Sequence, residues 1–336
     1  MKIAENISLK PYHTFGIEVK ARYLAELTDR KELPGFLSSL GKDHKPLLFI
    51  GGGSNLLFTR DFQGTVVRIM TRGITVKKEN PGEVFLAAEA GEPWDDVVKF
   101  AVGRNWGGLE NMSLIPGNAG TAPVQNIGAY GAELKDVLWS LDVFDLGTLE
   151  SHTLLNSECG FGYRESIFKQ AKGKFLILGV TLKLSKKPVL KLDYGQIREE
   201  LEHSGVSDPT LSEVREAVIR IRTRKLPDPS VHGNAGSFFK NPVVSGELLD
   251  QIRFEHPEVV FYPFGDQFKI AAAWLIEQCG WKGRRQGDAG VYPNQPLVLV
   301  NYGSASGKEI LDLASQIRNA VFEKFGIALE SEVNIF

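Results

Sequence analysis

The sequence predicts a protein of mixed α+β class with two or three domains. Its 336 residues exceed the usual size of one domain. Short β-branched or aromatic runs of strand length are mixed with amphipathic stretches, two of which begin at a capping box. Hydrophobic residues make up 43% of the chain and charged residues 24%, which is typical of a globular protein with enough apolar material for more than one core.

Composition excludes several classes of function. The formal net charge of −2 gives no general attraction to nucleic acid or to an anionic membrane. The first seventeen residues lack the apolar run of a signal peptide, and the longest apolar runs, Pro46–Ile50 and Pro296–Val300, are too short to span a bilayer. Two cysteines, Cys159 and Cys279, cannot build a disulfide framework or a structural zinc site. We therefore expect a cytoplasmic protein without a metal.

The first hundred residues are expected to form short strands, turns and modest helices. Pro46–Ile50 is a continuous apolar run and predicts a buried strand. Gly91–Gly103 predicts a helix, because Trp94, Val97, Val98 and Ala101 recur at helical spacing. The remaining expected elements are the strands Tyr23–Leu27, Gly64–Ile69 and Glu83–Ala88 and the helix Arg30–Leu40.

Capping boxes mark two helices in the second half of the chain. Thr210 and Glu213 open one, and Ser306 and Glu309 open the other, which ends at Gly326. A domain boundary is expected at Asp208-Pro209. The last ten residues predict a strand with Glu330 and Glu332 on its polar face. The other expected elements are the helix Ile270–Gln278 and the strands Val137–Phe144, Lys174–Leu184 and Pro296–Val300.

The stretch Ile115–Gly131, IPGNAGTAPVQNIGAYG, has little that can pack a core. Its glycines allow close approach of the backbone to a ligand, and Gln125 and Asn126 can each donate and accept hydrogen bonds. This composition favours a cradle for a large planar or phosphorylated ligand. A surface loop rich in turn residues is the alternative.

A second glycine loop, Gly51–Asn55, follows a predicted strand. Leu56 stands where a dinucleotide fingerprint requires its third glycine, and no P-loop motif occurs in either this loop or Gly303–Lys308. The loop is therefore neither a Rossmann nor a Walker site. It can still form a backbone nest for a pyrophosphate, or serve only as a tight turn.

Basic residues gather at the end of the helix that Thr210 opens. Arg220, Arg222, Arg224 and Lys225 are either a solvated face favoured by the helix dipole or part of an anion site. A second cluster, Lys282, Arg284 and Arg285, follows the helix that ends near Gly280.

Together with a further glycine-rich stretch, Gly233–Pro242, the stretch Ile115–Gly131 makes the sequence resemble the UDP-N-acetylenolpyruvoylglucosamine reductase (MurB) family. Five regions carry the resemblance and span nearly the whole chain: Gly51–Asn55, Ile115–Gly131, the motif Tyr163-Arg164-x-Ser166-x-Phe168, Gly233–Pro242 (GNAGSFFKNP) and Glu332. The region around Tyr194 resembles the longer form of the family, in which a tyrosine loop closes over the substrate.

The resemblance implies an FAD-binding fold of the vanillyl-alcohol-oxidase (PCMH) type. Two FAD-binding subdomains, 1–70 and 71–208, would be followed by an α+β substrate domain, 209–336, whose last strand returns to the active site. FAD would be held non-covalently. The positions that match FAD contacts are Gly51, Gly52, Gly53, Ser54, Asn55, Leu56, Gly117, Thr121, Pro123, Gln125, Asn126, Gly128, Ala129, Tyr130 and Gly131.

The implied reaction reduces UDP-N-acetylglucosamine enolpyruvate to UDP-N-acetylmuramate for peptidoglycan and cell-wall synthesis. NADPH gives hydride to the flavin, and flavin N5 then gives it to the methylene carbon of the enolpyruvyl group. Arg164 would hold the carboxylate and the developing enolate, Glu332 would assist, and Ser237 would donate the proton. Without the resemblance, Arg164 would be interpreted as one member of a surface ion pair, Glu332 as a solvated residue and Ser237 as a turn serine.

The resemblance also assigns positions to the nucleotide-sugar substrate, and NADPH would use the same pocket. These positions are Tyr163, Tyr194, Lys225, Asn241, Tyr262, Lys269, Lys282 and Gln295. We expect a monomer without nucleic-acid or membrane partners.

One departure from the family pattern concerns the C-terminus. The chain ends at Phe336, four residues after Glu332, and a frayed end would leave this carboxylate unpositioned. Two other functions stay open on the sequence: an oxidase of the same fold that acts on an alcohol or sugar, and a nucleotide-sugar binding protein without turnover.

Overall fold

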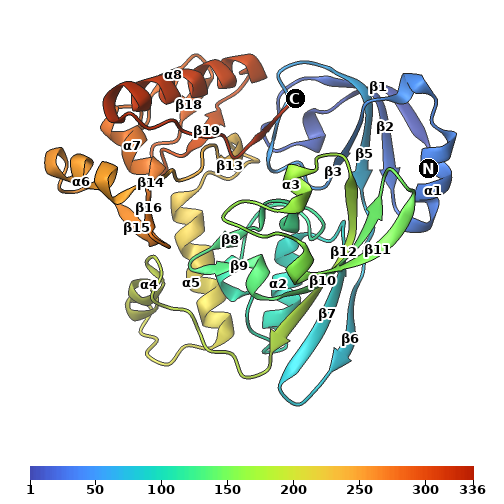
Figure 1. Ribbon diagram of the computed structural model, residues 1–336, viewed down its shortest axis with the longest axis horizontal. Helices are drawn as coiled ribbons and strands as arrows, with labels where there is room; N and C mark the ends of the chain where they lie inside the picture. The colour runs from blue at the N-terminus through green and yellow to red at the C-terminus, as the bar shows by residue number, and fades with distance from the viewer. The chain divides into compact units, whose positions relative to one another are not determined.

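The largest sheet has the strand order β11-β10-β12-β7-β6, and every pairing in it is antiparallel (Figure 1). It belongs to a computed structural model that describes all 336 residues. The chain divides into two units. Unit 1 comprises Met1–Ile7, Ala21–Gly52 and Gln63–Arg224, and unit 2 comprises Ser8–Lys20, Gly53–Phe62 and Lys225–Phe336.

Helices and strands alternate irregularly along the chain, which confirms the predicted α+β class. The helices are α1 (Leu33–Ser39), α2 (Trp94–Val102), α3 (Ile167–Gln170), α4 (Ile197–His203), α5 (Leu211–Lys225), α6 (Gly246–Glu255), α7 (Ala272–Gln278) and α8 (Gly307–Phe325). The strands are β1 (Ile3–Ser8), β2 (Lys20–Leu27), β3 (Leu47–Ile50), β4 (Leu56–Leu57), β5 (Phe62–Ile69), β6 (Ile74–Glu79), β7 (Glu83–Glu89), β8 (Gly128–Ala129), β9 (Ala132–Glu133), β10 (Leu138–Asp145), β11 (Glu150–Leu155), β12 (Phe175–Ser185), β13 (Gly233–Ser237), β14 (Val243–Val244), β15 (Phe261–Phe264), β16 (Gln267–Ile270), β17 (Arg285–Gln286), β18 (Ala289–Val291), β19 (Val298–Asn301) and β20 (Asn334–Ile335).

Strand β12 is the centre of unit 1 and is apolar along almost its whole length because both of its faces are covered. Ile177, Val180 and Leu182 pack in one core with α2, whereas Leu176 and Leu178 pack in a second core with α1. Burial on both faces explains why this strand lacks the polar alternation of a half-exposed one.

A four-stranded sheet, β1-β2-β5-β3, carries the glycine loop Gly51–Asn55 at its edge. Strand β3 pairs with β5 in parallel and runs directly into Gly51. The prediction of a buried strand at Pro46–Ile50 is wrong in part: only Ile50 is buried, since β3 is an edge strand that leaves Leu47–Phe49 half-covered.

In unit 2, α8 lies against β18 and β19 in a four-stranded sheet of order β13-β19-β18-β17 (Figure 1). A smaller sheet, β14-β16-β15, leads into α7. Both predicted capping boxes form. Glu213 and Glu309 each accept the backbone N–H of their partner, Thr210 and Ser306, at 2.7 Å.

The prediction of a strand over the last ten residues is wrong in extent. Only β20 is a strand, paired in parallel with β4, while Phe239 and Ser331 form an isolated bridge. The partner strand β4 is two residues long, so it offers no longer edge to pair with. The expected division of the FAD-binding part into two subdomains stays a prediction. Among the helices, none combines the length and apolarity that crossing a bilayer requires.

Candidate functional site

The two glycine loops of unit 1 lie against each other. A Cβ atom at Gly52 would stand 2.7 Å from Asn118 Oδ1, and one at Gly51 would stand 2.9 Å from Thr121 Cγ2. Such distances exclude a side chain at either position. The structure thus brings together the edge of β3 and the stretch Ile115–Gly131, which we call the cradle.

Both packing and polar contacts hold the first half of the cradle. The expectation that this stretch has little that can pack a core is wrong in part, because Ala119 and Ala122 are buried in the core of unit 1. Asn118 Nδ2 donates to the Gly91 carbonyl at 2.5 Å, and the Trp94 N–H donates to the Gly117 carbonyl at 2.9 Å. A Cβ at Gly120 would lie 2.4 Å from Ala90 Cβ. The loop is therefore pressed onto the turn before α2.

The Tyr163-Arg164-x-Ser166 motif is bonded to the second half of the cradle. Ser166 Oγ donates to the Val124 carbonyl at 2.6 Å, and Asn126 Nδ2 donates to the Gly162 carbonyl at 3.0 Å. Ser166 also caps the short helix α3. Two regions predicted from separate parts of the sequence therefore form one assembly.

Arg164 extends this assembly with its guanidinium. Its NH2 group donates to the Gly128 carbonyl at 3.0 Å, and its Cζ lies 5.6 Å from the centre of the Tyr163 ring. Arg164 has φ +55°, which is uncommon for a residue with a long side chain. Backbone strain of this kind clusters at functional sites, where the surrounding structure enforces it.

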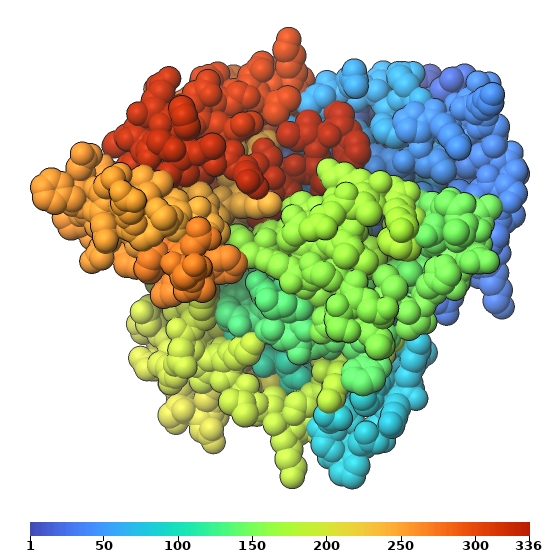
Figure 2. Space-filling view, viewed as in Figure 1, coloured from blue at the N-terminus to red at the C-terminus, as the bar shows by residue number.

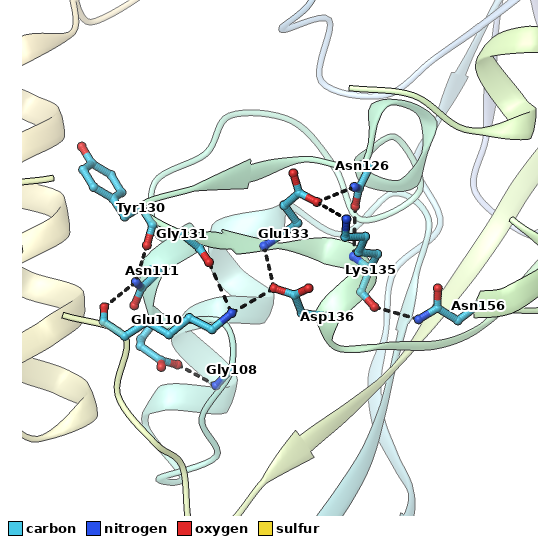
Figure 3. Close-up of polar contacts among 11 residues, drawn as sticks. Gly108, Glu110, Asn111, Asn126, Tyr130, Gly131, Glu133, Lys135, Asp136 and Asn156 are labelled. Atoms are coloured by element: carbon cyan, nitrogen blue, oxygen red, sulfur yellow. Dashed lines mark hydrogen bonds and ion pairs between the residues drawn. The ribbon is translucent and has the colours of Figure 1, made fainter. Parts of the chain in front are cut away.

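Asn126 is fully buried, and its amide is committed to the protein. It donates to Glu133 Oε2 at 3.1 Å as well as to Gly162, and it accepts the Lys135 N–H at 3.0 Å (Figure 3). Any cofactor contact at this residue would therefore come from its backbone. The other predicted contacts nearby, Gly128 to Gly131, form the short hairpin β8–β9.

Three arginines near the end of α5 have different environments. Arg220 and Arg224 both bond the carboxylate of Glu200, at 2.8 and 2.9 Å. Arg222 is only partly exposed, and its Nε is buried without a hydrogen-bond partner. Burial lowers the pKa of the Arg222 guanidinium, whereas the nearby Tyr130 and Asp95 act to raise it. Arginine stays charged nonetheless, so Arg222 is a cation with an unmet donor.

A fourth arginine of α5, Arg215, is bonded to the segment before the cradle. Arg215 makes two bonds to Asp95 of α2, at 2.8 and 2.6 Å, and Asp95 Oδ1 accepts the Leu114 N–H at 2.5 Å. Burial raises the pKa of the Asp95 carboxyl, but the hydrogen bonds from Arg215 and Leu114 bring the net pKa below its usual value. Leu114 has φ +58°, so this bond holds a strained residue next to Ile115.

In unit 2, the rest of the Gly51–Asn55 loop is bonded to the end of the chain. A Cβ at Gly53 would lie 2.1 Å from the Tyr12 carbonyl oxygen, which requires glycine. Asn55 Nδ2 donates to the Glu332 carbonyl at 3.2 Å, and the Asn55 carbonyl accepts the Asn334 N–H at 3.1 Å. Ser54 and Leu56 are half-buried beside it.

Hydrogen bonds and a ring contact attach Phe336 to residues 57–59, close to β4. The terminal Phe336 donates its N–H to the Leu57 carbonyl at 2.9 Å and accepts from the N–H and the hydroxyl of Thr59. Its ring also lies 5.5 Å from that of Phe58.

Backbone pairing joins Glu332 to the segment that follows Ser237. The Glu332 N–H donates to the Phe238 carbonyl at 2.8 Å, so the predicted acid is bonded to the residue that follows the predicted proton donor. Ser237 itself ends β13 opposite Val298, and Gly236 before it has φ +70°. Asn234 fixes this turn by accepting the Gly236 N–H at 3.0 Å.

The predicted substrate residues of unit 2 lie on its hairpin and turns. Tyr262 and Lys269 face each other across β15 and β16. Asn241 Oδ1 accepts the Ala272 N–H at 3.0 Å and so caps α7. Lys282 bonds Glu277 at 2.7 Å in an exposed ion pair. Lys225 ends α5, and Gln295 stands in the turn before β19.

Sequence reasoning missed three contributors: Asn111, Asn118 and the Asp95–Arg215 pair. Asn118 lies inside a motif already singled out, so its amide could have been considered. The others give no local signal, because their partners are far away in the sequence.

Comparisons with known proteins cover the whole chain. Residues 21–149 match a family model described as an FAD binding domain, and residues 228–336 match the C-terminal domain of UDP-N-acetylenolpyruvoylglucosamine reductase. A UDP-N-acetylenolpyruvoylglucosamine reductase of Pseudomonas putida is 49% identical over 99% of this chain and 98% of its own length. One of Flavobacterium johnsoniae is 48% identical, with both chains fully covered. The crystal structure of the Thermus caldophilus reductase aligns with a TM-score of 0.71 at 26% identity, covering 100% of this chain and 99% of its own.

The Asp95–Arg215 pair makes stability dependent on pH. We expect Asp95→Asn to destabilise the cofactor-free protein by about 2 kcal/mol at pH 7, because it leaves a mostly buried arginine without its anion. The pKa of Asp95 is lowered in the folded state, so this stabilisation is present above pH ~4 and is lost as the pH falls below it. Urea unfolding between pH 3 and 7 would measure the difference between the variant and the natural protein.

Asp96→Asn is the matched control, since Asp96 is the next residue of α2 and is exposed. It should shift stability by less than about 1 kcal/mol at pH 7. A stability difference for Asp95→Asn that stays constant from pH 3 to 7 would contradict the assignment.

Proposed function

Because the chain belongs to the UDP-N-acetylenolpyruvoylglucosamine reductase family, we propose that it reduces UDP-N-acetylglucosamine enolpyruvate to UDP-N-acetylmuramate with hydride from NADPH. It is an FAD-dependent oxidoreductase of peptidoglycan synthesis. The observation that supports the detailed proposal is the bond from the Glu332 N–H to the carbonyl of Phe238, the residue after the serine that would donate the proton.

The residues of unit 1 fit FAD on two counts. Gly51 and Gly52 lie against Thr121 and Asn118, so the two glycine-rich loops that carry the proposed FAD contacts lie together. Arg222 presents a buried cation with an unmet donor, and FAD has an anionic diphosphate as well as polar flavin edges. When bound, FAD supplies a carrier that can take up hydride and pass it on.

Arg164 would bind the carboxylate of the enolpyruvyl group. Addition of hydride to the methylene carbon leaves negative charge on the neighbouring carbon and on this carboxylate. A planar guanidinium can accept that charge through two parallel hydrogen bonds. The bond from Arg164 to the Gly128 carbonyl sets the direction of its guanidinium, which has five donors in all.

Ser237 and Glu332 would complete the addition. The Ser237 hydroxyl delivers its proton to the carbon next to the carboxylate, so that one hydride and one proton together saturate the double bond. Glu332 lies alongside, where a protonated carboxyl can donate a hydrogen bond to the developing charge.

Polar side chains at the positions that the family resemblance assigns would bind the substrate's diphosphate and uracil. Tyr262 and Lys269 form a cross-strand pair suited to phosphate oxygens. The exposed Lys282–Glu277 pair is weak, so a phosphate can compete for this lysine. Lys225, Asn241, Gln295, Tyr163 and Tyr194 are the remaining proposed contacts.

An anaerobic titration tests the reaction itself. We expect the purified yellow protein to bleach on addition of NADPH and to regain its flavin absorption bands when UDP-N-acetylglucosamine enolpyruvate is added without oxygen. Visible absorption spectra would record both steps. Recovery of the bands only after air is admitted would refute the substrate assignment and favour an oxidase.

Ser237→Ala should separate the two halves of the reaction. Reoxidation by the enolpyruvyl substrate should slow by about a hundredfold or more, as expected for loss of a general acid. Reduction of the flavin by NADPH should keep its rate, because it needs no proton from Ser237. Stopped-flow absorbance would measure both rates.

Ser230→Ala is the control, because Ser230 lies in the same segment and only bonds Asp228. It should leave both rates unchanged. An equal loss of both rates in Ser237→Ala would point to a damaged fold and remove the proton-donor role.

Arg222→Met should weaken FAD binding without destabilising the cofactor-free protein. Removing an unpaired buried cation relieves a desolvation cost, so the apoprotein should melt at the same temperature or higher. The Kd for FAD should rise about tenfold or more with loss of a charged hydrogen bond. Arg220→Met, which removes an exposed partner of Glu200 on the same helix, should leave the Kd unchanged. An unaltered Kd in Arg222→Met would rule out its contact with FAD.

A further inference from the structure

A strained turn lies at the end of the cradle. Strands β8 and β9 are joined by Tyr130 and Gly131, whose φ values are +49° and +78°. Two central residues with positive φ are the mark of a type I′ hairpin turn. A tyrosine rarely adopts this conformation, so surrounding contacts must stabilise it.

Asn111 supplies one of these contacts and connects the turn to another segment. Its Nδ2 donates to the Tyr130 carbonyl and to the Lys191 carbonyl, each at 2.8 Å. Figure 3 shows the amide of Asn111 directed at the Tyr130 carbonyl. The residue is 2% exposed, and its Oδ1 is buried without a partner. Both of its donors therefore serve to join two backbone segments.

Lys191 reinforces the same connection with its side chain. Its Nζ donates to the Gly131 carbonyl at 3.3 Å and to Asp136 Oδ2 at 3.0 Å. One residue is thus joined to the turn twice, through its own carbonyl and through its ammonium group. Lys191 begins the segment Lys191–Gly195, which we call the tyrosine loop and which lies in the chain between β12 and α4. The yellow-green part of the chain that contains this loop lies at the surface in Figure 2.

Two tyrosines pack on two glycines across this junction. A Cβ at Gly131 would stand 3.2 Å from Tyr194 Cβ, and a Cβ at Gly195 would stand 3.0 Å from Tyr130 Cδ1. Each segment therefore provides a ring for the other's glycine. Polar and apolar contacts fix one position of the tyrosine loop on the cradle.

We propose that Asn111 is a positioning residue that sets where Tyr194 meets the substrate by fixing the tyrosine loop to the cradle turn. This inference rests on the proposed function, because it takes the phosphate-bearing substrate as the ligand of Tyr194. The position requires asparagine: two carbonyls need two donors, and an aspartate would place a negative charge beside both of their oxygens. The same contacts couple the sites, since FAD that orders the cradle also orders the tyrosine loop.

The test compares Asn111→Ala with Asn156→Ala in the FAD-loaded protein. Asn156 is a matched control, because its Nδ2 also bridges two carbonyls, of Lys135 and Leu138, at 2.7 and 2.9 Å. Figure 3 shows it bonded to Lys135, away from the Tyr130 turn. Amide hydrogen exchange of residues 189–196 reports the loop, and steady-state kinetics with UDP-N-acetylglucosamine enolpyruvate reports its effect.

We expect exchange in residues 191–195 to rise about tenfold in Asn111→Ala, and KM to rise about tenfold while kcat changes less than about threefold. Asn156→Ala should change neither. Unaltered exchange in Asn111→Ala, or an equal rise in Asn156→Ala, would overturn the inference. Exchange needs no substrate, so it decides the positioning role even if the enolpyruvyl compound proves to be the wrong substrate.

A second variant covers the case in which Asn111→Ala does not fold. Lys191→Met removes only a half-exposed ammonium group, and Lys187→Met changes an exposed lysine before the same loop. The rate of amide hydrogen exchange in residues 191–195 should rise about threefold in Lys191→Met and stay constant in Lys187→Met. No difference between these two variants would also overturn the inference.

Discussion

A glycine-rich backbone that must approach a large ligand closely has few side chains of its own to hold it in place. The cradle combines burial of Ala119, Ala122 and Ile127 in the core of unit 1 with hydrogen bonds to its backbone. Ser166 and Asn111 each donate to a cradle carbonyl, and Asn118 of the cradle donates to the Gly91 carbonyl. Such bonds stabilise the positions that lack an apolar side chain, because they act on the backbone that glycine leaves bare. The arrangement of unit 1 follows from this need.

In unit 2, hydrogen bonds of the main chain fix the segment that carries Glu332. The N–H of Glu332 is bonded to Phe238 and its carbonyl to Asn55, so a residue near the end of the chain is fixed on both sides. Three hydrogen bonds and two aromatic contacts then hold Phe336. These contacts fix the position of the segment that carries Glu332.

The arginines of helix α5 differ in whether the protein supplies a carboxylate as partner. Arg220 and Arg224 share Glu200, and Arg215 pairs with Asp95, so these cations are neutralised by the protein. Arg222 has no such anion and has a buried donor that lacks a partner. An unmet buried charge destabilises a folded protein unless a ligand completes it. Arg222 is therefore the arginine of α5 for which we propose a contact with FAD.

The sequence alone determined the features that depend on neighbouring residues. The capping boxes at Thr210 and Ser306 and the glycine loops were readable because each signal lies within a few positions, and the family motifs added Arg164, Ser237 and Glu332 as candidates. Tertiary structure decided the rest. Arg220, Arg222 and Arg224 look alike in sequence, and only the packing of α5 separates the buried one from the other two. The form of the last segment depended on the length of β4. Asn111 gave no signal at all, because the two carbonyls it bridges come from distant segments and any backbone offers the same group.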